Sequence, residues 1–280
     1  MAKTTTTRDS WISAETERKE ADYRGLLKMH IDICKGLIHR QNAQPYLYID
    51  LYAGPGHLEF EGRTFDGSPL IARDLLQTAP VPYDAVHFEK VTEVARRLED
   101  ALATPSGVLW APDASSTIIN EAFETAFPRW LANAGRQPDR YGLIYSDPIR
   151  DEIPHAILNQ AAELLPRVDI LSYVSGTQYK RRRGQDRWRN GSTELPLLGD
   201  HIRAVNKQIA LIRKPLGAWQ WTFVLWSNWV NMPAWTNHGF YRLDSPEGRQ
   251  ILDQLNLTER EHREKANTPL PFPPSGESAA

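Results

Sequence analysis

Cysteine is almost absent from the chain, since Cys34 is the only one among 280 residues. An internal disulfide is therefore impossible, and a metal site built from several thiolates is excluded. The eight histidines show neither the H-x-x-x-H nor the H-E-x-x-H spacing of helical zinc ligands, so no metal site is predicted. We expect Cys34 itself to lie in the core.

Long hydrophobic runs are missing as well. No stretch approaches the roughly 18 apolar residues of a membrane span, and the start, "MAKTTTTRDSWISAETERKE", lacks the apolar core of a secretory signal. We therefore expect a cytoplasmic protein that does not bind membranes. With 41% hydrophobic and 24% charged residues, the chain has enough apolar side chains for one buried core with appendages.

Short apolar runs alternate with longer helical patterns through most of the chain. The runs lie at 46–52, 83–89, 107–111, 141–147, 168–174, 219–228 and 239–243, and the helical patterns lie at 68–78, 91–103, 115–134 and 154–165. Such alternation is typical of a parallel sheet with helices on both faces. The last two runs are joined by too few residues for a helical crossover, so we expect them to pair antiparallel. The predicted fold is α/β, with five parallel strands and a terminal antiparallel strand pair.

Three parts of the chain differ in composition. Apolar residues at helical spacing predict an amphipathic helix within 9–40 that lies on the main domain. We therefore divide the chain into an N-terminal helical extension (1–45), an α/β domain (46–250) and a polar, proline-rich tail (251–280) that is not expected to pack.

The first predicted strand runs into a glycine turn in "YIDLYAGPG", residues 48–56. Glycines let the backbone approach a ligand at the carboxyl end of a strand. A dinucleotide fingerprint would need G-x-G-x-x-G with a helix that opens at once and meets a pyrophosphate. Here the helix is predicted to begin only at Ser68-Pro69, with Ser68 as its N-cap. The turn therefore favours a ligand that has no phosphates.

Carboxylates stand at the ends of four successive predicted strands, at Asp50, Glu89, Asp113 and Asp147. Because the carboxyl ends of parallel strands share one edge of a sheet, we expect these acids to lie close together. Glu89 can accept hydrogen bonds from both hydroxyls of a ribose, Asp113 from an exocyclic amine, and Asp147 can reach the reacting centre. Each acid could instead cap a helix or form a turn, but four in order favour a ligand site.

Several segments resemble the three-Cys-motif partner protein family, a branch of the class I S-adenosylmethionine-dependent methyltransferases. They are "YIDLYAGPG", "GSPLIA", "HFEK", "SDP" and "DILSYVSGTQYKR", and the resemblance covers roughly residues 20–250. It implies a Rossmann-like, seven-stranded, mostly parallel sheet with the last strand inserted antiparallel, and S-adenosylmethionine as the cofactor. It also implies a separate partner protein with three cysteines.

The same resemblance implies a set of cofactor-binding residues. In this family the glycine turn faces the methionine moiety, the acid after the second strand faces the ribose, and the acid after the third strand faces the adenine. Carried onto this sequence, these residues are Asp50, Tyr52, Ala53, Gly54, Pro55 and Gly56 for the methionine moiety, Glu89 for the ribose, and Asp113 with Ala114 for the adenine.

The segment "SDPIRD" follows the fourth predicted strand. Enzymes that methylate amino groups of nucleic acids place Asp-Pro-Pro-aromatic there, where the Asp accepts from the target amine and the aromatic stacks on the flipped base. Asp147 and Pro148 match and are the predicted catalytic residues, whereas Ile149 and Arg150 do not match. An adenine or cytosine amino target is therefore poorly supported. A cytosine carbon-5 enzyme would need a cysteine nucleophile here, and none is present.

A basic segment, "GTQYKRRRGQDRWRNG" at 176–191, follows the fifth predicted strand in a chain whose net charge is −2. Six basic residues oppose one acidic residue in it. A basic loop with aromatic side chains suits a phosphate backbone and stacked bases, although basic runs are also common on solvated surfaces. The predicted substrate-binding residues are Tyr179, Lys180, Arg181, Arg182, Arg183, Arg187, Trp188 and Arg189.

The leading hypothesis is an S-adenosylmethionine-dependent methyltransferase that acts on nucleic acid, with DNA favoured over RNA. The alternative is a non-catalytic module that binds nucleic acid or a partner and keeps the methyltransferase fold. The departure at Ile149 and Arg150 favours the module, whereas the retained Asp50, Glu89 and Asp113 favour the enzyme. A nicotinamide-dependent oxidoreductase is disfavoured, because the third glycine of its fingerprint is absent.

Overall fold

The computed structural model describes residues 14–41, 43–104, 114–148, 153–190, 197–215 and 221–257. Its helices are α1 (Ala14–Gln41), α2 (Ser68–Thr78), α3 (Thr92–Ala103), α4 (Phe123–Ala134), α5 (His155–Leu164), α6 (Gly176–Asn190), α7 (Leu198–Arg203), α8 (Pro233–Asn237) and α9 (Pro246–Asn256). Its strands are β1 (Tyr46–Asp50), β2 (His57–Phe60), β3 (Arg63–Asp66), β4 (Tyr83–Phe88), β5 (Ala114–Ile119), β6 (Gly142–Ser146), β7 (Val168–Ser175), β8 (Ile209–Arg213), β9 (Trp221–Ser227) and β10 (Phe240–Arg242).

The main sheet has eight strands in the order β10-β8-β9-β7-β6-β1-β4-β5. Strands β1, β4, β5, β6 and β7 run parallel, and β9 lies antiparallel between β7 and β8. The chain leaves β1 toward β4 and β5 and then crosses to β6, so the strand order reverses between β1 and β6. This is a Rossmann-like, mostly parallel α/β sheet. Ligands of such sheets bind outside the carboxyl ends of the strands at the reversal point.

The strand count corrects the sequence prediction, which has seven strands because it omits β8. That strand lies between β9 and β10 and pairs antiparallel with both. The prediction that the last two runs pair with each other is therefore wrong. The inserted antiparallel strand is confirmed, but it is β9 and not the last strand of the chain. A short apolar run such as "IALIR" fits a strand or a helix equally well, which is why β8 is hard to identify.

The third parallel strand and the basic segment also differ from the prediction. The run at 107–111 lies outside the described residues. Strand β5 overlaps the start of the helix predicted for 115–134, and α4 forms the later part of that helix. Because β5 is an edge strand with three exposed residues in its middle, its hydrophobic alternation is weak. The basic segment forms helix α6 and not a loop. Arg, Lys and Gln favour helices, and no proline interrupts this stretch.

Other elements agree closely with the sequence. The helices predicted at 68–78, 91–103 and 154–165 are confirmed by α2, α3 and α5, with ends that differ by at most one residue. Helix α1 confirms the amphipathic helix, and Cys34 is buried on it. The domain boundary placed at residue 250 falls inside α9, whose Ile251 and Leu255 are buried in the core.

A hairpin fills the interval between the glycine turn and α2. Strands β2 and β3 pair antiparallel as a separate two-stranded sheet. Glu61 and Gly62 turn between them with φ of 51° and 75°, as a two-residue hairpin loop of type I′ requires. Helix α2 then begins at Ser68 with Gly67 as its cap residue, one position before the predicted cap.

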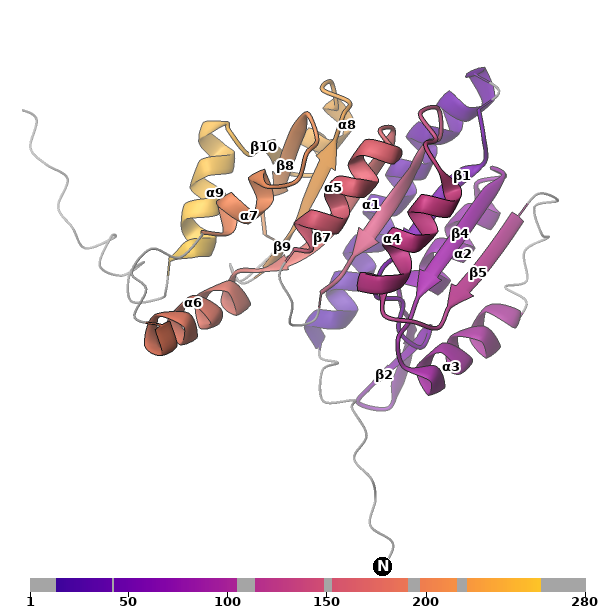
Figure 1. Ribbon diagram of the computed structural model, residues 1–280, viewed down its shortest axis with the longest axis horizontal. Helices are drawn as coiled ribbons and strands as arrows, with labels where there is room; N and C mark the ends of the chain where they lie inside the picture. The colour runs from indigo at the N-terminus through magenta and orange to yellow at the C-terminus, as the bar shows by residue number, and fades with distance from the viewer. Residues whose placement is uncertain are drawn as a thin grey trace, which may run out of the picture.

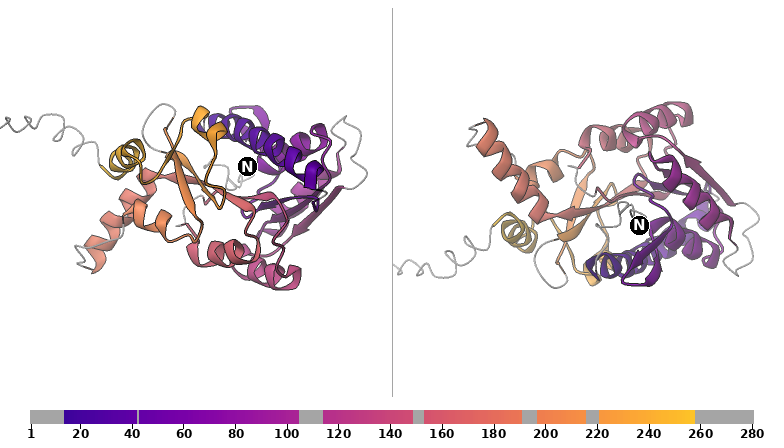
Figure 2. Two further views of the ribbon diagram at one scale, coloured as in Figure 1. Left: turned by 90° about the horizontal axis from the view of Figure 1, so that it is seen from above. Right: turned by 90° about the horizontal axis from the view of Figure 1, so that it is seen from below.

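Helices cover both faces of the sheet. Helices α1, α2 and α8 pack on one face, and α4, α5, α7 and α9 pack on the other (Figure 1; Figure 2). Because successive side chains of a strand point to opposite faces, β1 directs Tyr46 and Tyr48 to the α1 face and Leu47 and Ile49 to the α4 face. Asp50 continues the α1-facing series at the end of the strand.

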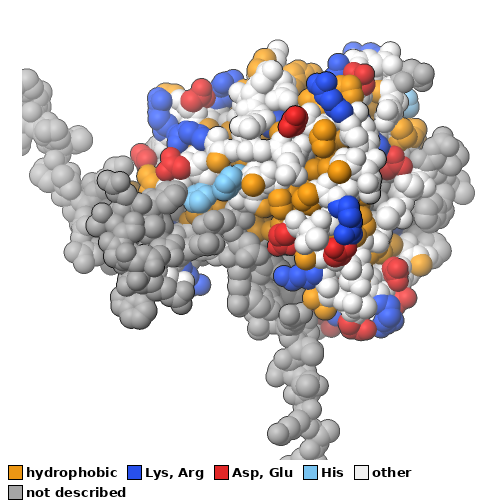
Figure 3. Space-filling view, in the orientation of Figure 1, with side chains coloured by type: hydrophobic (Ala, Val, Ile, Leu, Met, Phe, Trp, Pro, Cys, Tyr) orange, Lys and Arg blue, Asp and Glu red, His pale blue; other side chains and the backbone are white. Residues whose placement is uncertain are grey.

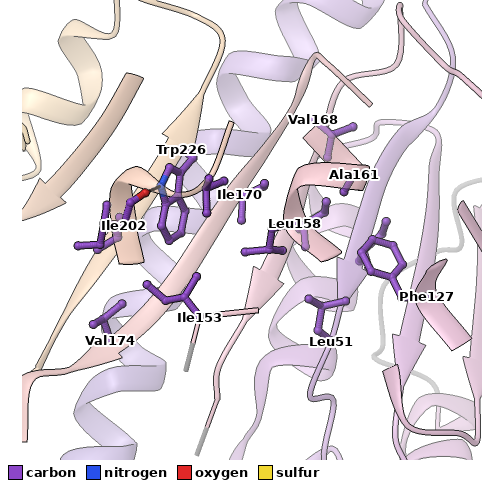
Figure 4. Packing of buried hydrophobic residues seen from close by; sticks show 14 of the residues in the cluster. Leu51, Phe127, Ile153, Leu158, Ala161, Val168, Ile170, Val174, Ile202 and Trp226 are labelled. Carbon is purple, nitrogen blue, oxygen red and sulfur yellow. Dashed lines mark hydrogen bonds between the residues drawn. The ribbon is translucent and has the colours of Figure 1, made fainter. Parts of the chain in front are cut away.

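The core on the α4 face is a continuous apolar layer (Figure 4). Trp226 is fully buried in it, and its indole Nε1 donates to Ile202 O at 2.8 Å, which satisfies its polar atom. On the outside of this face, basic and acidic side chains of the described residues are interspersed (Figure 3). Among the residues that the structure describes, none of the helices is long and apolar enough to span a bilayer.

Candidate active site

The turn after β1 lies at the carboxyl edge of the sheet, beside the point where the strand order reverses. Leu51 N donates to Tyr145 O on one side, and Ala53 N donates to Phe88 O on the other, both at 3.1 Å. Two neighbouring strands therefore hold the backbone of the turn in place.

Two glycines give this turn its shape. Gly54 has a φ of 68° and Gly56 a φ of 84°, and both values favour glycine. A Cβ on Gly56 would lie 3.0 Å from Ala101 Cβ, whereas a Cβ on Gly54 would meet no described atom within 4 Å. Gly56 is therefore needed for close packing on α3, and Gly54 leaves space beside the backbone.

Glu89 follows β4 and connects that strand to the glycine turn. Its Oε2 accepts a hydrogen bond from Gly54 N at 3.2 Å, and its Oε1 accepts one from Val91 N at 2.8 Å. The residue is half-buried, and each carboxylate oxygen keeps a further lone pair. Glu89 is thus held against the turn with capacity to accept from the two hydroxyls of a ribose.

Asp50 ends β1 and is fully buried. Tyr48 OH and Tyr52 N each donate to its carboxylate at 3.1 Å, and Ser68 also hydrogen-bonds it. Burial nevertheless raises the pKa of Asp50 to about 6, because these hydrogen bonds only partly offset the loss of solvent. Asp50 therefore supports the turn from the α1 face and changes its charge just below neutral pH.

Asp147 follows β6 and forms an ion pair with Lys19 of α1. Lys19 Nζ also lies 3.3 Å from Glu20 Oε1 and 5.1 Å from the centre of the Tyr173 ring. Burial alone lowers the pKa of Lys19, but the two carboxylates outweigh burial and the net shift is upward. The predicted catalytic carboxylate is therefore balanced by a cation from the N-terminal helix.

Glu20 is a site residue that the sequence prediction omits. It is 5% exposed, and burial raises its pKa to about 7. Its Oε2 and the Tyr145 hydroxyl have no hydrogen-bond partner among the described residues, and Tyr145 stacks on Tyr23 of α1 with ring centres 4.1 Å apart. Buried polar atoms without partners are rare and require an explanation, such as a bound ligand.

The helical pattern of α1 contains a signal for Glu20. Glu20, Tyr23, Leu27 and Ile31 lie at helical spacing, and all four are buried. A glutamate where the periodicity calls for an apolar residue indicates a buried charge, which must be paired or bound. The amphipathic helix within 9–40 is predicted from its apolar residues alone, and so the prediction misses Glu20.

Of the two predicted adenine contacts, only Ala114 belongs to the described residues, and it does not lie at this edge. Ala114 begins β5 and pairs with Tyr83 at the start of β4, so it lies at the opposite edge of the sheet, and Asp113 lies outside the described residues. Ala114 is misplaced because the predicted third strand lies at 107–111, whereas β5 begins at Ala114 itself. The carboxyl end of β5 brings Asn120 to the site instead, and its Nδ2 donates to Glu89 O at 2.8 Å.

The other predicted cofactor and catalytic residues lie around the glycine turn and the end of β6. Tyr52 packs its ring on Phe123 with centres 4.8 Å apart. Ala53 is buried, Pro55 is half-buried, and Pro148, two residues after the end of β6, is buried. These residues shape the edge by packing.

The predicted substrate-binding residues belong to α6, which begins where β7 ends and projects beyond the sheet (Figure 1). Tyr179 OH accepts a hydrogen bond from Ile153 N at 3.1 Å, and Lys180 Nζ donates to Leu257 O at 2.8 Å. These two residues therefore attach α6 to the rest of the protein, while Arg181 is exposed. The remaining predicted residues have side chains outside the described part of the structure: Arg182, Arg183, Arg187, Trp188 and Arg189.

Comparisons with known proteins reveal only distant resemblances. No protein-family model and no curated protein matches the chain. A Legionella pneumophila protein of the DUF519 family is 14% identical, with a TM-score of 0.45 over 82% of this chain and 90% of that chain. A SAM-dependent methyltransferase from Methanosarcina mazei is 12% identical, with a TM-score of 0.39 over 67% of this chain and 94% of that chain. A spermidine synthase from Thermotoga maritima is 11% identical, with a TM-score of 0.37 over 79% and 68% of the two chains. We draw no functional conclusion from likenesses at this level, and the resemblance to the three-Cys-motif partner family rests on its sequence motifs.

Proposed function

We propose that the chain is an S-adenosylmethionine-dependent methyltransferase that acts on nucleic acid, with DNA as the favoured substrate. The observation that carries the proposal is Glu89, whose carboxylate accepts from Gly54 N at 3.2 Å at the reversal point of the sheet. A carboxylate fixed against an open glycine turn suits a nucleoside, because it binds the ribose while the backbone accommodates the rest of the cofactor.

The residues at this edge fit S-adenosylmethionine. Glu89 would hold the ribose, Asn120 lies where an adenine would follow, and the turn from Tyr52 to Gly56 would contact the methionine moiety. The cofactor has no phosphates, which agrees with a hairpin and not a helix after the turn. When bound, it supplies a methyl group on a positively charged sulfonium.

Asp147 is the residue that we assign to the reacting centre. Its carboxylate would accept a hydrogen bond from the group to be methylated and orient it. The ion pair with Lys19 restricts the position of this carboxylate. Lys19 thereby acts as a positioning residue.

Helix α6 supports nucleic acid as the substrate. It starts at the carboxyl end of β7, the same edge at which β1, β4 and β6 end, and six of its residues are basic against one acid. A basic helix that extends from the cofactor edge can contact a phosphate backbone while a base reaches the site. A separate partner protein with three cysteines remains a prediction from the resemblance.

Transfer of a labelled methyl group from S-adenosylmethionine to DNA, RNA or protein tests the proposal. The assay is run with and without cell extract, so that a required partner is supplied. Asp147→Ala should abolish transfer and leave cofactor affinity within about tenfold, or 1.4 kcal/mol. Asp139→Ala serves as the control, because Asp139 is 73% exposed and pairs only with Arg167 at 3.4 Å among the described contacts. A wild-type chain that binds the cofactor and methylates none of these acceptors would contradict the proposal.

The salt dependence of binding tests the role of α6. Counterion release makes the logarithm of affinity fall linearly with the logarithm of salt concentration. Replacing Arg181, Arg182 and Arg183 together by Ala should flatten this slope by about two units or more. An unchanged slope would remove α6 from the nucleic-acid interface.

The alternative function is a non-catalytic module that binds nucleic acid or a partner. The observation in its favour is the Lys19–Asp147 ion pair, which occupies the predicted catalytic carboxylate. Ile149 and Arg150, which depart from the amino-methylating motif, lie outside the described residues. Cofactor binding together with nucleic-acid binding and no transfer would favour this module.

A further inference from the structure

We infer that Glu20 of α1 is a further cofactor-binding residue, and that it makes the site prefer the positively charged sulfonium of S-adenosylmethionine to the neutral thioether of the demethylated product. This inference rests on the proposed function, since it concerns the same cofactor. It assigns to the N-terminal helix a part in ligand selection.

The first observation is an excess of negative charge at the start of α1. Lys19 Nζ pairs with Asp147 and lies 3.3 Å from Glu20 Oε1. Asp50 is close enough that its charge contributes to the upward shift in the pKa of Glu20. Three carboxylates and one ammonium therefore share this part of the edge. Buried charges of one sign need a partner of the other sign, and a cationic ligand provides it.

The second observation is the free oxygen of Glu20. Its Oε1 faces Lys19, but its Oε2 has no hydrogen-bond partner among the described residues, although the residue is only 5% exposed. Tyr145 is fully buried at the end of β6, and its hydroxyl also has no hydrogen-bond partner among the described residues. Two such polar atoms, on two elements that meet at the site, indicate a ligand that lies between α1 and β6.

The chemistry of the two ligands explains the expected preference. A sulfonium carries its positive charge at every pH, whereas the thioether that remains after methyl transfer is neutral. Both ligands share the ribose, the adenine and the methionine amino and carboxyl groups. Electrostatic attraction to Glu20 therefore makes the affinities of the two ligands differ only through the charge at the reacting sulfur. A site that loses this attraction when the methyl group leaves also releases its product more readily.

Titration calorimetry on Glu20→Gln tests the inference with three probes: S-adenosylmethionine, S-adenosylhomocysteine and sinefungin, which carries a protonated amine in place of the methylsulfonium. We expect the variant to lose about tenfold or more in affinity for the two cationic ligands and less than about threefold for the neutral product. Glu17→Gln is the matched control, because Glu17 lies one turn earlier on α1 and pairs with Arg63 at 2.9 Å. It should change none of the three affinities.

Three outcomes decide the matter. Equal losses for all three ligands would show that Glu20 binds the shared amino group, and this would overturn the preference. Unchanged affinities in a folded variant would remove Glu20 from the site. A wild-type chain that binds none of the ligands would refute the proposed function itself, so the two failures are distinguishable.

The wild-type chain offers a second test that needs no substitution. Because the pKa of Glu20 is raised to about 7 by burial, acidification from pH 8 to pH 6 should reduce the ratio of sulfonium to thioether affinity severalfold, and Glu20→Gln should show a smaller change. A flat ratio in the wild type would contradict the inference. Asp50, with a pKa raised to about 6, contributes mainly at the acidic end. The other titratable groups that interact with Glu20 are Lys19 and Tyr23 on α1 and Tyr145 and Asp147 at β6. Tyr48 contacts Asp50, and the Tyr173 ring lies beside Lys19.

Discussion

The Lys19–Asp147 ion pair should attach the start of α1 to the sheet, and its loss should destabilise the whole fold. The two side chains are 12% and 16% exposed, so little water remains to stabilise either charge alone. Removing one partner of a buried pair typically costs about 3–5 kcal/mol. The residual exposure places Lys19→Met at the lower end of that range, at about 3 kcal/mol.

A double-mutant cycle isolates this interaction. Lys19→Met, Asp147→Asn and the double variant are unfolded in urea, and the free energies of unfolding are compared by linear extrapolation. Because the double variant leaves no uncompensated charge in the pair, it should be less destabilised than the sum of the singles, with a coupling energy of about 2 kcal/mol. The Arg96–Asp100 pair, with side chains 58% and 68% exposed, is the control and should couple by no more than about 0.5 kcal/mol. Additive effects at Lys19 and Asp147 would refute the reasoning.

Three further predictions concern the turn and two buried titratable groups. Gly56→Ala should lower the free energy of unfolding in urea by about 2–3 kcal/mol, because its new Cβ would lie 3.0 Å from a neighbouring side-chain carbon at a φ of 84°. Gly54→Ala should cost only about 1 kcal/mol. Equal costs would argue against a role for Gly56 in packing on α3. The folded pKa of Glu20, about 7, lies above its ordinary 4.5, so its contribution to stability is present below pH 4.5 and lost as pH rises through 7. The wild type should lose about 2–3 kcal/mol between pH 5 and pH 8, and Glu20→Gln should not show this loss. Burial lowers the pKa of His30, but Cys34 and then Asp169 raise it to about 10, so stability should fall as pH rises from 6.5 toward 10. A His30→Gln variant with the same fall would contradict this prediction.

The parts of the fold that the sequence predicts are those with local signals. The glycine turn, the late helix at Ser68-Pro69 and the acid at Glu89 each depend on residues close together in the chain, and the structure has all three. The hairpin at β2 and β3 had a local signal as well, in a Glu61-Gly62 turn between two alternating segments. Its turn lacks the Asn or Asp that usually precedes the glycine.

The remaining features depend on tertiary contacts. Strand β5 has an exposed middle because it lies at the sheet edge, and so its sequence looks polar. The pairing of β8 with both β9 and β10 follows from their order in the sheet, which no single run encodes. Lys19 and Glu20 enter the site only because α1 packs across the ends of β1 and β6, far from it in sequence. The roles of Lys19 and Glu20 can therefore be recognised only once the position of α1 on the sheet is known.

Titration of S-adenosylmethionine into the chain, followed by the same titration into Glu89→Ala, tests the central claim most directly. The wild type should bind, and the variant should bind at least about a hundredfold more weakly, because it loses two charge-assisted hydrogen bonds to the ribose worth about 1.5–3 kcal/mol each. Glu93→Gln, which replaces an acid on the first turn of α3 that is 67% exposed, should bind like the wild type. A folded wild-type chain that fails to bind the cofactor at millimolar concentration would contradict the claim, and an unchanged affinity in Glu89→Ala would contradict the role of Glu89 in it.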